Sequence, residues 1–178
     1  MQGTLRLIGW MEAHAGPWGI CGALLLVVHA NAVARDLPVP SGAAATLEVA
    51  MLLVLLGGVV GHHLLQGTHP ASWVGWAGAA TIGFAFVGGL PLVCAGTALF
   101  GLAVLRCHVL RSSTGALVLL GSLLLMASTL APGFGPDSSE PVGTGWLLLM
   151  NAGLVLLAGG MTDLAVTERA TRQSSATA

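Results

Sequence analysis

WVGWAGAATIGFAFVGGLPLVCAGTALFGLAVL, residues 73–105, is a run of 33 residues without a charged side chain. A single helix of this length would extend about 50 Å, which exceeds the roughly 30 Å hydrocarbon core of a bilayer unless the helix is steeply tilted. Gly88-Gly89-Leu90-Pro91 offers a natural break, because proline suits the first turn of a helix and glycine suits a reversal of the chain. We therefore predict two short helices, at residues 73–88 and 90–105.

The composition of the whole chain is that of a membrane protein. Of its 178 residues, 55% are hydrophobic and only 7% are charged, against about 25% charged residues in an average soluble domain. The mean hydropathy is +0.88. The chain has a net charge of −1 and no cluster of basic residues, so we do not expect it to bind nucleic acid. The chain has no Lys and no Tyr and is rich in Ala, Gly, Leu and Val, which is typical of a GC-rich bacterial genome. We therefore expect a bacterial cytoplasmic (cell) membrane as its location.

Four more apolar segments complete the expected fold, an all-α integral membrane protein with a bundle of six transmembrane helices at residues 17–166. An interfacial segment, residues 1–16, precedes the bundle, and a polar tail, residues 167–178, follows it and is expected to be disordered at its end. A second interpretation treats the first span as a cleaved signal peptide, because Ala32-Val33-Ala34 resembles a cleavage site. The four additional spans are residues 17–34, 43–65, 114–131 and 145–166.

The arginines predict the orientation of the spans, since cytoplasmic loops of membrane proteins are enriched in Lys and Arg. With six spans and both termini cytoplasmic, Arg35 is the one arginine outside. A five-span model with an outside N-terminus also leaves one arginine out, namely Arg6. Arginine counting therefore does not separate the two models, and the choice of six rests on the length of residues 73–105.

Small residues and tryptophans mark helix contacts and membrane boundaries. Trp73 and Trp76 open the third span, where aromatic side chains form a belt at the headgroup level. The three cysteines, Cys21, Cys94 and Cys107, form no CxxC pair and are predicted to be small packing residues. Spacings of small residues that allow helices to approach closely occur at Gly57, Gly61, Gly75, Ala79 and Gly83.

Polar side chains near the outer ends of three spans form the candidate site. In antiparallel spans, His29 and Glu48 lie at the same depth, so we predict that they are within hydrogen-bonding reach, directly or through a water. Because polar residues inside a membrane usually face the interior of a bundle, they could form a proton- or ligand-sensitive pocket. The alternative is that Glu48 is an interfacial end residue and that the asparagines join helices. This outer polar cluster comprises His29, Asn31, Glu48 and Asn151.

A second group of polar residues lies at the cytoplasmic helix ends. Imidazoles and thiolates can bind transition metals or haem, and His63 and His108 come nearest to a ligand pair, because they lie 45 residues apart in two stretches with faint similarity. Their spacing matches no ligand motif, so we expect polar side chains at the headgroup level, with no metal and no haem. The group comprises His62, His63, His69, Cys107 and His108.

One part of the chain resembles a known group of proteins. Residues 99–106, LFGLAVLR, followed after a short turn by residues 115–121, GALVLLG, look like a pattern in small uncharacterised multi-pass membrane proteins of actinobacteria. The members of that group commonly carry a Pro-Arg pair in the turn, where this chain has Arg111-Ser112-Ser113. The resemblance implies a membrane location and no known activity.

Three classes of function remain open on the sequence. The first is a multi-pass membrane protein without catalytic activity, acting as an accessory, assembly or envelope component. The second is a small-solute or ion carrier or channel subunit, and the third is a haem- or metal-binding redox membrane protein. We expect the first, because no charged side chain lies at mid-bilayer depth and no enzyme motif occurs in a plausible context. The expected partners are the lipid bilayer and either a second copy of the chain or another membrane protein.

Overall fold

The computed structural model describes residues 2–35, 40–65, 70, 72–108, 111–130 and 143–176. These residues form seven helices and no strand, which confirms the all-α prediction for the described part of the chain. The helices are α1 (Gln2–Ala34), α2 (Ser41–Leu65), α3 (Ser72–Gly83), α4 (Ala85–Gly88), α5 (Leu90–Cys107), α6 (Ser112–Ser128) and α7 (Thr144–Ala176).

Four helices of the described residues are long and apolar enough to cross a membrane. Their apolar parts are Gly9–Ala34, Gly42–Leu64, Leu90–Cys107 and Thr144–Thr167. The helix α6, with 17 residues, is apolar but shorter, and α3 has only 12 residues. The protein is therefore a helical membrane protein with four candidate spanning helices and a shorter pair beside them.

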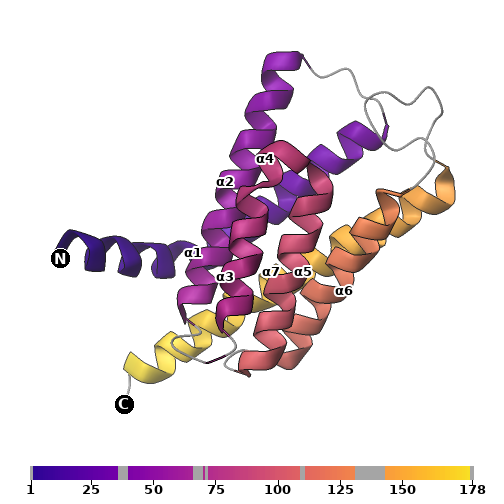
Figure 1. The fold of residues 1–178 in the computed structure, drawn as a ribbon. Helices are drawn as coiled ribbons and strands as arrows, with labels where there is room; N and C mark the ends of the chain where they lie inside the picture. Colours follow the sequence, from indigo (N-terminus) through magenta and orange to yellow (C-terminus); the bar gives the residue numbers. More distant parts are fainter. Residues whose placement is uncertain are drawn as a thin grey trace.

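The helices follow one another around a closed ring (Figure 1). Each helix packs on the next in the order α1, α2, α3, α5, α6 and α7, and α7 packs back on α1. The helices α2, α5 and α7 run in one direction, and α1, α3 and α6 run in the other. The four-residue α4 forms the reversal between α3 and α5. The first turns of α1 project sideways from the ring, ahead of Pro17, which lies inside this helix.

The predicted break in the long apolar run is confirmed. Between α4 and α5, Gly89 has a φ of 64° and a ψ of −156°, a backbone conformation that a residue with a Cβ rarely adopts. The next helix carries Pro91 in its first turn, where the missing N–H of proline costs no helical hydrogen bond. The glycine and the proline therefore produce the reversal together, as the sequence predicts.

Close approach of backbones holds α1 to α2. A Cβ added to Gly22 would lie 2.6 Å from Leu55 Cα, and one added to Gly58 would lie 2.5 Å from the Gly19 nitrogen. Such distances leave no room for any side chain, so both positions require glycine. In a bilayer, where lipid is as apolar as the helix surface, this close packing is a main source of helix association.

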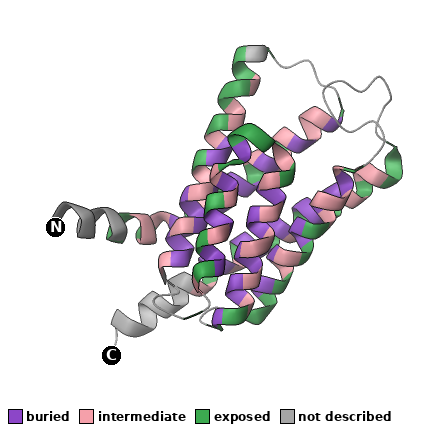
Figure 2. Ribbon diagram, viewed as in Figure 1, coloured by how far each residue is buried: buried purple, intermediate pink, exposed green. Residues whose placement is uncertain are grey.

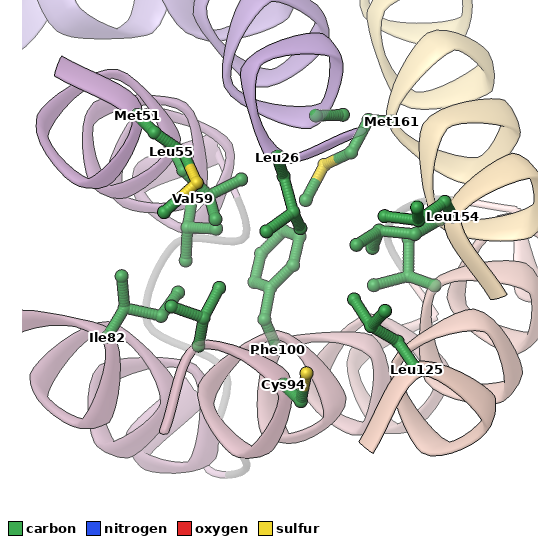
Figure 3. Packing of buried hydrophobic residues seen from close by; sticks show 14 of the residues in the cluster. Leu26, Met51, Leu55, Val59, Ile82, Cys94, Phe100, Leu125, Leu154 and Met161 are labelled. Carbon is green, nitrogen blue, oxygen red and sulfur yellow. The ribbon is translucent and has the colours of Figure 1, made fainter. Parts of the chain in front are cut away.

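Apolar side chains fill the centre of the ring. Phe100 of α5 is fully buried and points inward, with Leu26 of α1 and Met161 of α7 on the opposite side (Figure 3). Met51 and Leu55 of α2 lie on another side of the same cluster, and residues of the other helices complete it. Exposed residues lie on the outward faces of the helices (Figure 2). These faces carry large apolar side chains, among them Leu24, Leu53, Leu148 and Val155, as expected for contact with lipid.

Some sequence predictions about the chain ends and the cysteines need correction. Residues 1–16 were predicted as a separate segment, but α1 is continuous from Gln2 to Ala34. Their location at a membrane interface stays a prediction. The helix α7 continues to Ala176, and the end of the tail, where the sequence predicts disorder, lies outside the described residues. The cysteines Cys94 and Cys107 are buried, as packing residues would be, whereas Cys21 is exposed on the outer face of α1.

We predict that Gly22→Ala and Gly58→Ala each destabilise the protein by about 1–3 kcal/mol, because the added methyl group must push two backbones apart. Gly159→Ala is the matched control, since a Cβ there meets nothing within 4 Å. This control should be neutral or stabilising by about 0.5–1 kcal/mol, because alanine favours the helix. Thermal unfolding of the protein in detergent measures both effects. Equal unfolding temperatures for all three variants would refute the close-approach argument.

Candidate functional site

Asn31 and Asn151 of the outer polar cluster are in direct contact. Asn31 Nδ2 donates a hydrogen bond to Asn151 Oδ1 at 3.2 Å, from α1 to α7. Each amide also donates to the carbonyl four residues earlier in its own helix, Asn31 to Val27 O at 3.0 Å and Asn151 to Leu147 O at 2.8 Å. Both side chains are partly buried. The contact therefore joins the first and the last helix at the position where the ring closes.

His29 and Glu48 do not form a direct hydrogen bond, and a bond through a water stays a prediction. Both side chains are half-buried, and among the described residues no hydrogen bond or ion pair joins them. Their depths match as predicted, since each lies seven residues along its helix from the close contact of Gly22 with Leu55. The helices α1 and α2 diverge beyond this contact toward the end that carries His29 and Glu48 (Figure 1). Equal depth therefore does not bring the two side chains together.

His62 and His63 lie in the last turn of α2, at the helix end that the sequence predicts, but neighbouring helices cover them. Both are buried, at 0% and 2% exposure. The imidazole of His62 faces the inside of the ring, with its Nε2 3.5 Å from the position of a Cβ on Gly19 and its ring 6.5 Å from that of Phe100. Met161 Sδ lies 3.6 Å from the same Gly19 position. A histidine therefore sits among α1, α2, α5 and α7 at the inner end of the apolar core.

His63 points the other way, toward α3. Its ring packs edge-on against Trp76, with the ring centroids 4.8 Å apart and an angle of 80° between the planes. A Cβ on Gly75 would overlap this imidazole, so the glycine makes room for it. His108 is exposed at the end of α5, with a φ of 52°. His63 and His108 are therefore in different environments, and His69 lies outside the described residues.

The described residues contain no group of three or more His, Cys, Asp or Glu side chains that could hold a metal ion. Met161 Sδ and His62 Nε2 lie near the same point, 3.6 and 3.5 Å from the position of a Cβ on Gly19. Two ligands without a carboxylate to orient the imidazole make a poor site for zinc, and haem would require the apolar core to open. The geometry thus gives no support to the redox hypothesis.

Two further contacts between polar side chains were not predicted. Thr114 at the start of α6 donates a hydrogen bond from Oγ1 to the Asp163 Oδ2 of α7. Ser122 of α6 donates to Thr97 Oγ1 of α5 at 2.8 Å, and Thr97 in turn donates to Val93 O at 2.9 Å within its own helix. Thr97, Ser122 and Thr114 are fully buried. Polar side chains therefore also join α5 to α6 and α6 to α7.

A signal for the Asp163 contact was present in the sequence. Gly153 and Gly160 are seven residues apart, so they lie on one face of α7, and both contact α6 closely. Asp163 follows Gly160 by three residues and lies on the same face. A carboxylate on the face of a span that carries such glycines indicates a partner on the neighbouring helix.

These polar groups satisfy one another. In the three contacts between helices, a hydroxyl, amide or carboxylate of one helix meets a polar atom of the next, and the asparagines and Thr97 also bond to their own backbone. Such bonds between membrane helices contribute about 0.6 kcal/mol on average. The arrangement favours a structural role for Asn31 and Asn151 over a ligand pocket.

Comparison with known proteins finds no counterpart: no protein-family model, no curated protein and no solved structure matches the chain. The resemblance of residues 99–121 to actinobacterial membrane proteins therefore stays a prediction.

We predict that Asn31 and Asn151 are energetically coupled. Asn31→Ala and Asn151→Ala should each destabilise the protein, and the double variant should lose less than the sum of the two. The expected coupling is about 0.6 kcal/mol and at most about 1.7 kcal/mol. Unfolding of the four proteins in detergent measures it. A matched cycle with His29→Ala and Glu48→Ala should show no coupling, and coupling there with none between the asparagines would contradict the assignment.

Proposed function

We propose that the protein is a non-catalytic integral membrane protein that acts as an accessory, assembly or envelope component of a bacterial cytoplasmic membrane. The observation that carries this proposal is the filled centre of the helical ring, where Phe100, Leu26 and Leu55 are fully buried in one apolar cluster. Ions cross such a centre only at a high desolvation cost. The surfaces left for function are the outward helix faces and the connections.

The polar contacts support the same proposal. An enzyme or a carrier needs polar groups directed toward a substrate, whereas Asn31, Asn151, Thr97 and Ser122 bond to one another across helix contacts. The location in a bacterial cell membrane is part of the same proposal. It rests on the composition of the chain, which has no Lys and no Tyr.

A carrier is the second candidate, and one observation favours it. His62 is an ionisable side chain that faces the inside of the ring beside Phe100 and Met161. Ionisable groups within membrane proteins commonly mark ion or proton pathways. In the proposed function, by contrast, His62 is a packing residue of the inner end of the core.

The topology that accompanies the proposal has six crossings with both termini cytoplasmic. The alternating directions of the six longer helices support it, since the chain then returns to the side from which it started. Four of the crossings correspond to helices of sufficient length, and α3 and α6 make the shorter two. Of the six arginines, Arg35 would be the one outside.

Cysteine labelling at Pro40 tests the topology. Pro40 lies before α2, outside the cell in the six-span model and inside in the five-span model. We predict that Pro40→Cys reacts in intact cells with a membrane-impermeant maleimide, in a Cys21→Ala background that removes the exposed native thiol. Gly143→Cys is the control, because both models place it outside. Both models place the C-terminus inside, so a reporter that works only in the cytoplasm should be active when it is fused there. An unreactive Pro40→Cys beside a reactive Gly143→Cys would overturn the six-span model.

Flux measurements separate the two candidate functions. Proteoliposomes that enclose a pH-sensitive dye should show the proton flux of protein-free liposomes, because the apolar centre around Phe100 blocks a polar path. Flux above this level would support the carrier if His62→Ala reduced it and Leu148→Ala did not. Leu148 is the matched control because it lies exposed on the outer face of α7.

A further inference from the structure

The reversal between α3 and α5 is both apolar and exposed. Phe84 is 68% exposed, Phe86 50% and Val87 93%, and Figure 2 shows this turn as exposed. From Ile82 to Gly96 the chain carries no charged, amide or hydroxyl side chain. The sequences of the two other connections at this end are different: one contains Arg35 and Asp36, and the other, residues 131–142, contains two carboxylates. The α3–α5 reversal is therefore the least polar of the three connections at this end, which a turn exposed to water would not require.

Several backbone N–H groups of this reversal are hydrogen-bonded within the turn. The N–H groups of Val87 and Gly88 donate to Phe84 O at 3.0 and 3.3 Å, and that of Gly89 donates to Ala85 O at 2.7 Å. Beyond the turn, the N–H groups of Leu92 and Val93 donate to Gly89 O at 3.1 and 3.4 Å. In hydrocarbon each peptide group without a partner costs several kcal/mol, so a turn that remains there must bond to itself. The one-turn helix α4 meets this requirement for the N–H groups of Val87, Gly88 and Gly89.

Helix lengths place the turn below the far boundary of the bilayer. Trp73, which is exposed at the start of α3, marks the near boundary as an aromatic belt residue. Fourteen residues separate Trp73 from Val87, a rise of about 21 Å, whereas the hydrocarbon core is roughly 30 Å thick. The neighbouring span Gly42–Leu64 has 23 residues, a rise of about 35 Å.

We propose that the reversal between α3 and α5 lies inside the hydrocarbon layer, with Phe84, Phe86 and Val87 in contact with lipid acyl chains. The hairpin then enters and leaves the membrane on the same side, while its tip stays in the far leaflet. This inference goes beyond the proposed function and does not rest on it. The hairpin replaces the third and fourth crossings of the proposed topology by one re-entrant segment, which leaves four full crossings. The sides of the termini and of Pro40 do not change, so the Pro40 labelling result does not depend on the hairpin.

Collision measurements on a spin label test the depth of the turn. A nitroxide attached to Val87→Cys in the Cys21→Ala protein is measured in liposomes with molecular oxygen, which concentrates in lipid, and with a water-soluble nickel chelate. Two matched sites calibrate the result: Val155→Cys on the outer face of α7, as a lipid-exposed position, and Gly143→Cys, as a water-exposed position. A second label at Phe84→Cys repeats the test within the turn. Cys94 and Cys107 are buried, so labelling is expected at one site in each protein.

The expected result is an oxygen-to-nickel collision ratio at Val87 and Phe84 that is close to that at Val155 and several-fold above that at Gly143. A ratio equal to that at Gly143 would overturn the proposal, because it would place the turn in water. Low collision rates with both reagents would also overturn it, because they would show the turn covered by protein instead of lipid. The unfolding temperature of each labelled protein verifies that the ring is intact.

Discussion

In the hydrocarbon layer of a bilayer no water is present to hydrogen-bond the peptide groups, and this constraint underlies the whole structure. It requires helices wherever the chain crosses, and it also restricts where the chain can turn. At Gly89 the turn is made with the positive φ that glycine permits, and the flanking helix ends bond to Phe84 O, Ala85 O and Gly89 O. The other connections contain charged or polar residues and are suited to water. The distribution of polar residues among the connections therefore follows the medium in which each turn lies.

Once the helices exist, lipid supplies no hydrophobic force to bring them together, so contact depends on shape and on hydrogen bonds. At Gly22 and Gly58 the backbones of α1 and α2 approach until no Cβ fits, and Gly121 and Gly153 do the same for α6 and α7. The polar contacts act at other points of the ring, and the Asn31–Asn151 bond joins α1 and α7, which are far apart in sequence. The ring is thus closed by one amide pair at the outer end and by apolar packing around its centre.

Sequence reasoning predicted the helices better than it predicted their contacts. The break at Gly89 follows from glycine and proline chemistry that acts over a few residues, and the structure confirms it. The depth of His29 and Glu48 also follows from counting residues, yet the divergence of α1 and α2 depends on the whole ring and is not encoded locally. For the same reason the sequence places His62 at a helix end, as observed, but does not indicate that α1, α5 and α7 surround it. Spacing also selected Gly83 as a contact glycine, whereas a Cβ there meets nothing and the tight contacts include Gly22 and Gly58.

The filled centre and the short hairpin together bear on what the chain can do. A pathway through the ring would have to pass Phe100 and the leucines around it, which form one packed cluster, so opening it would require the helices to separate. The glycine contacts oppose separation, because the close approach of Gly22 to Leu55 would be lost. The α3–α5 hairpin is held by similar contacts, such as that of Gly78 with Gly96, but its helix α3 is short and its turn carries exposed apolar side chains. The physical features that remain for interaction are therefore the outer helix faces and this hairpin, which is consistent with an accessory role and does not require a transport path.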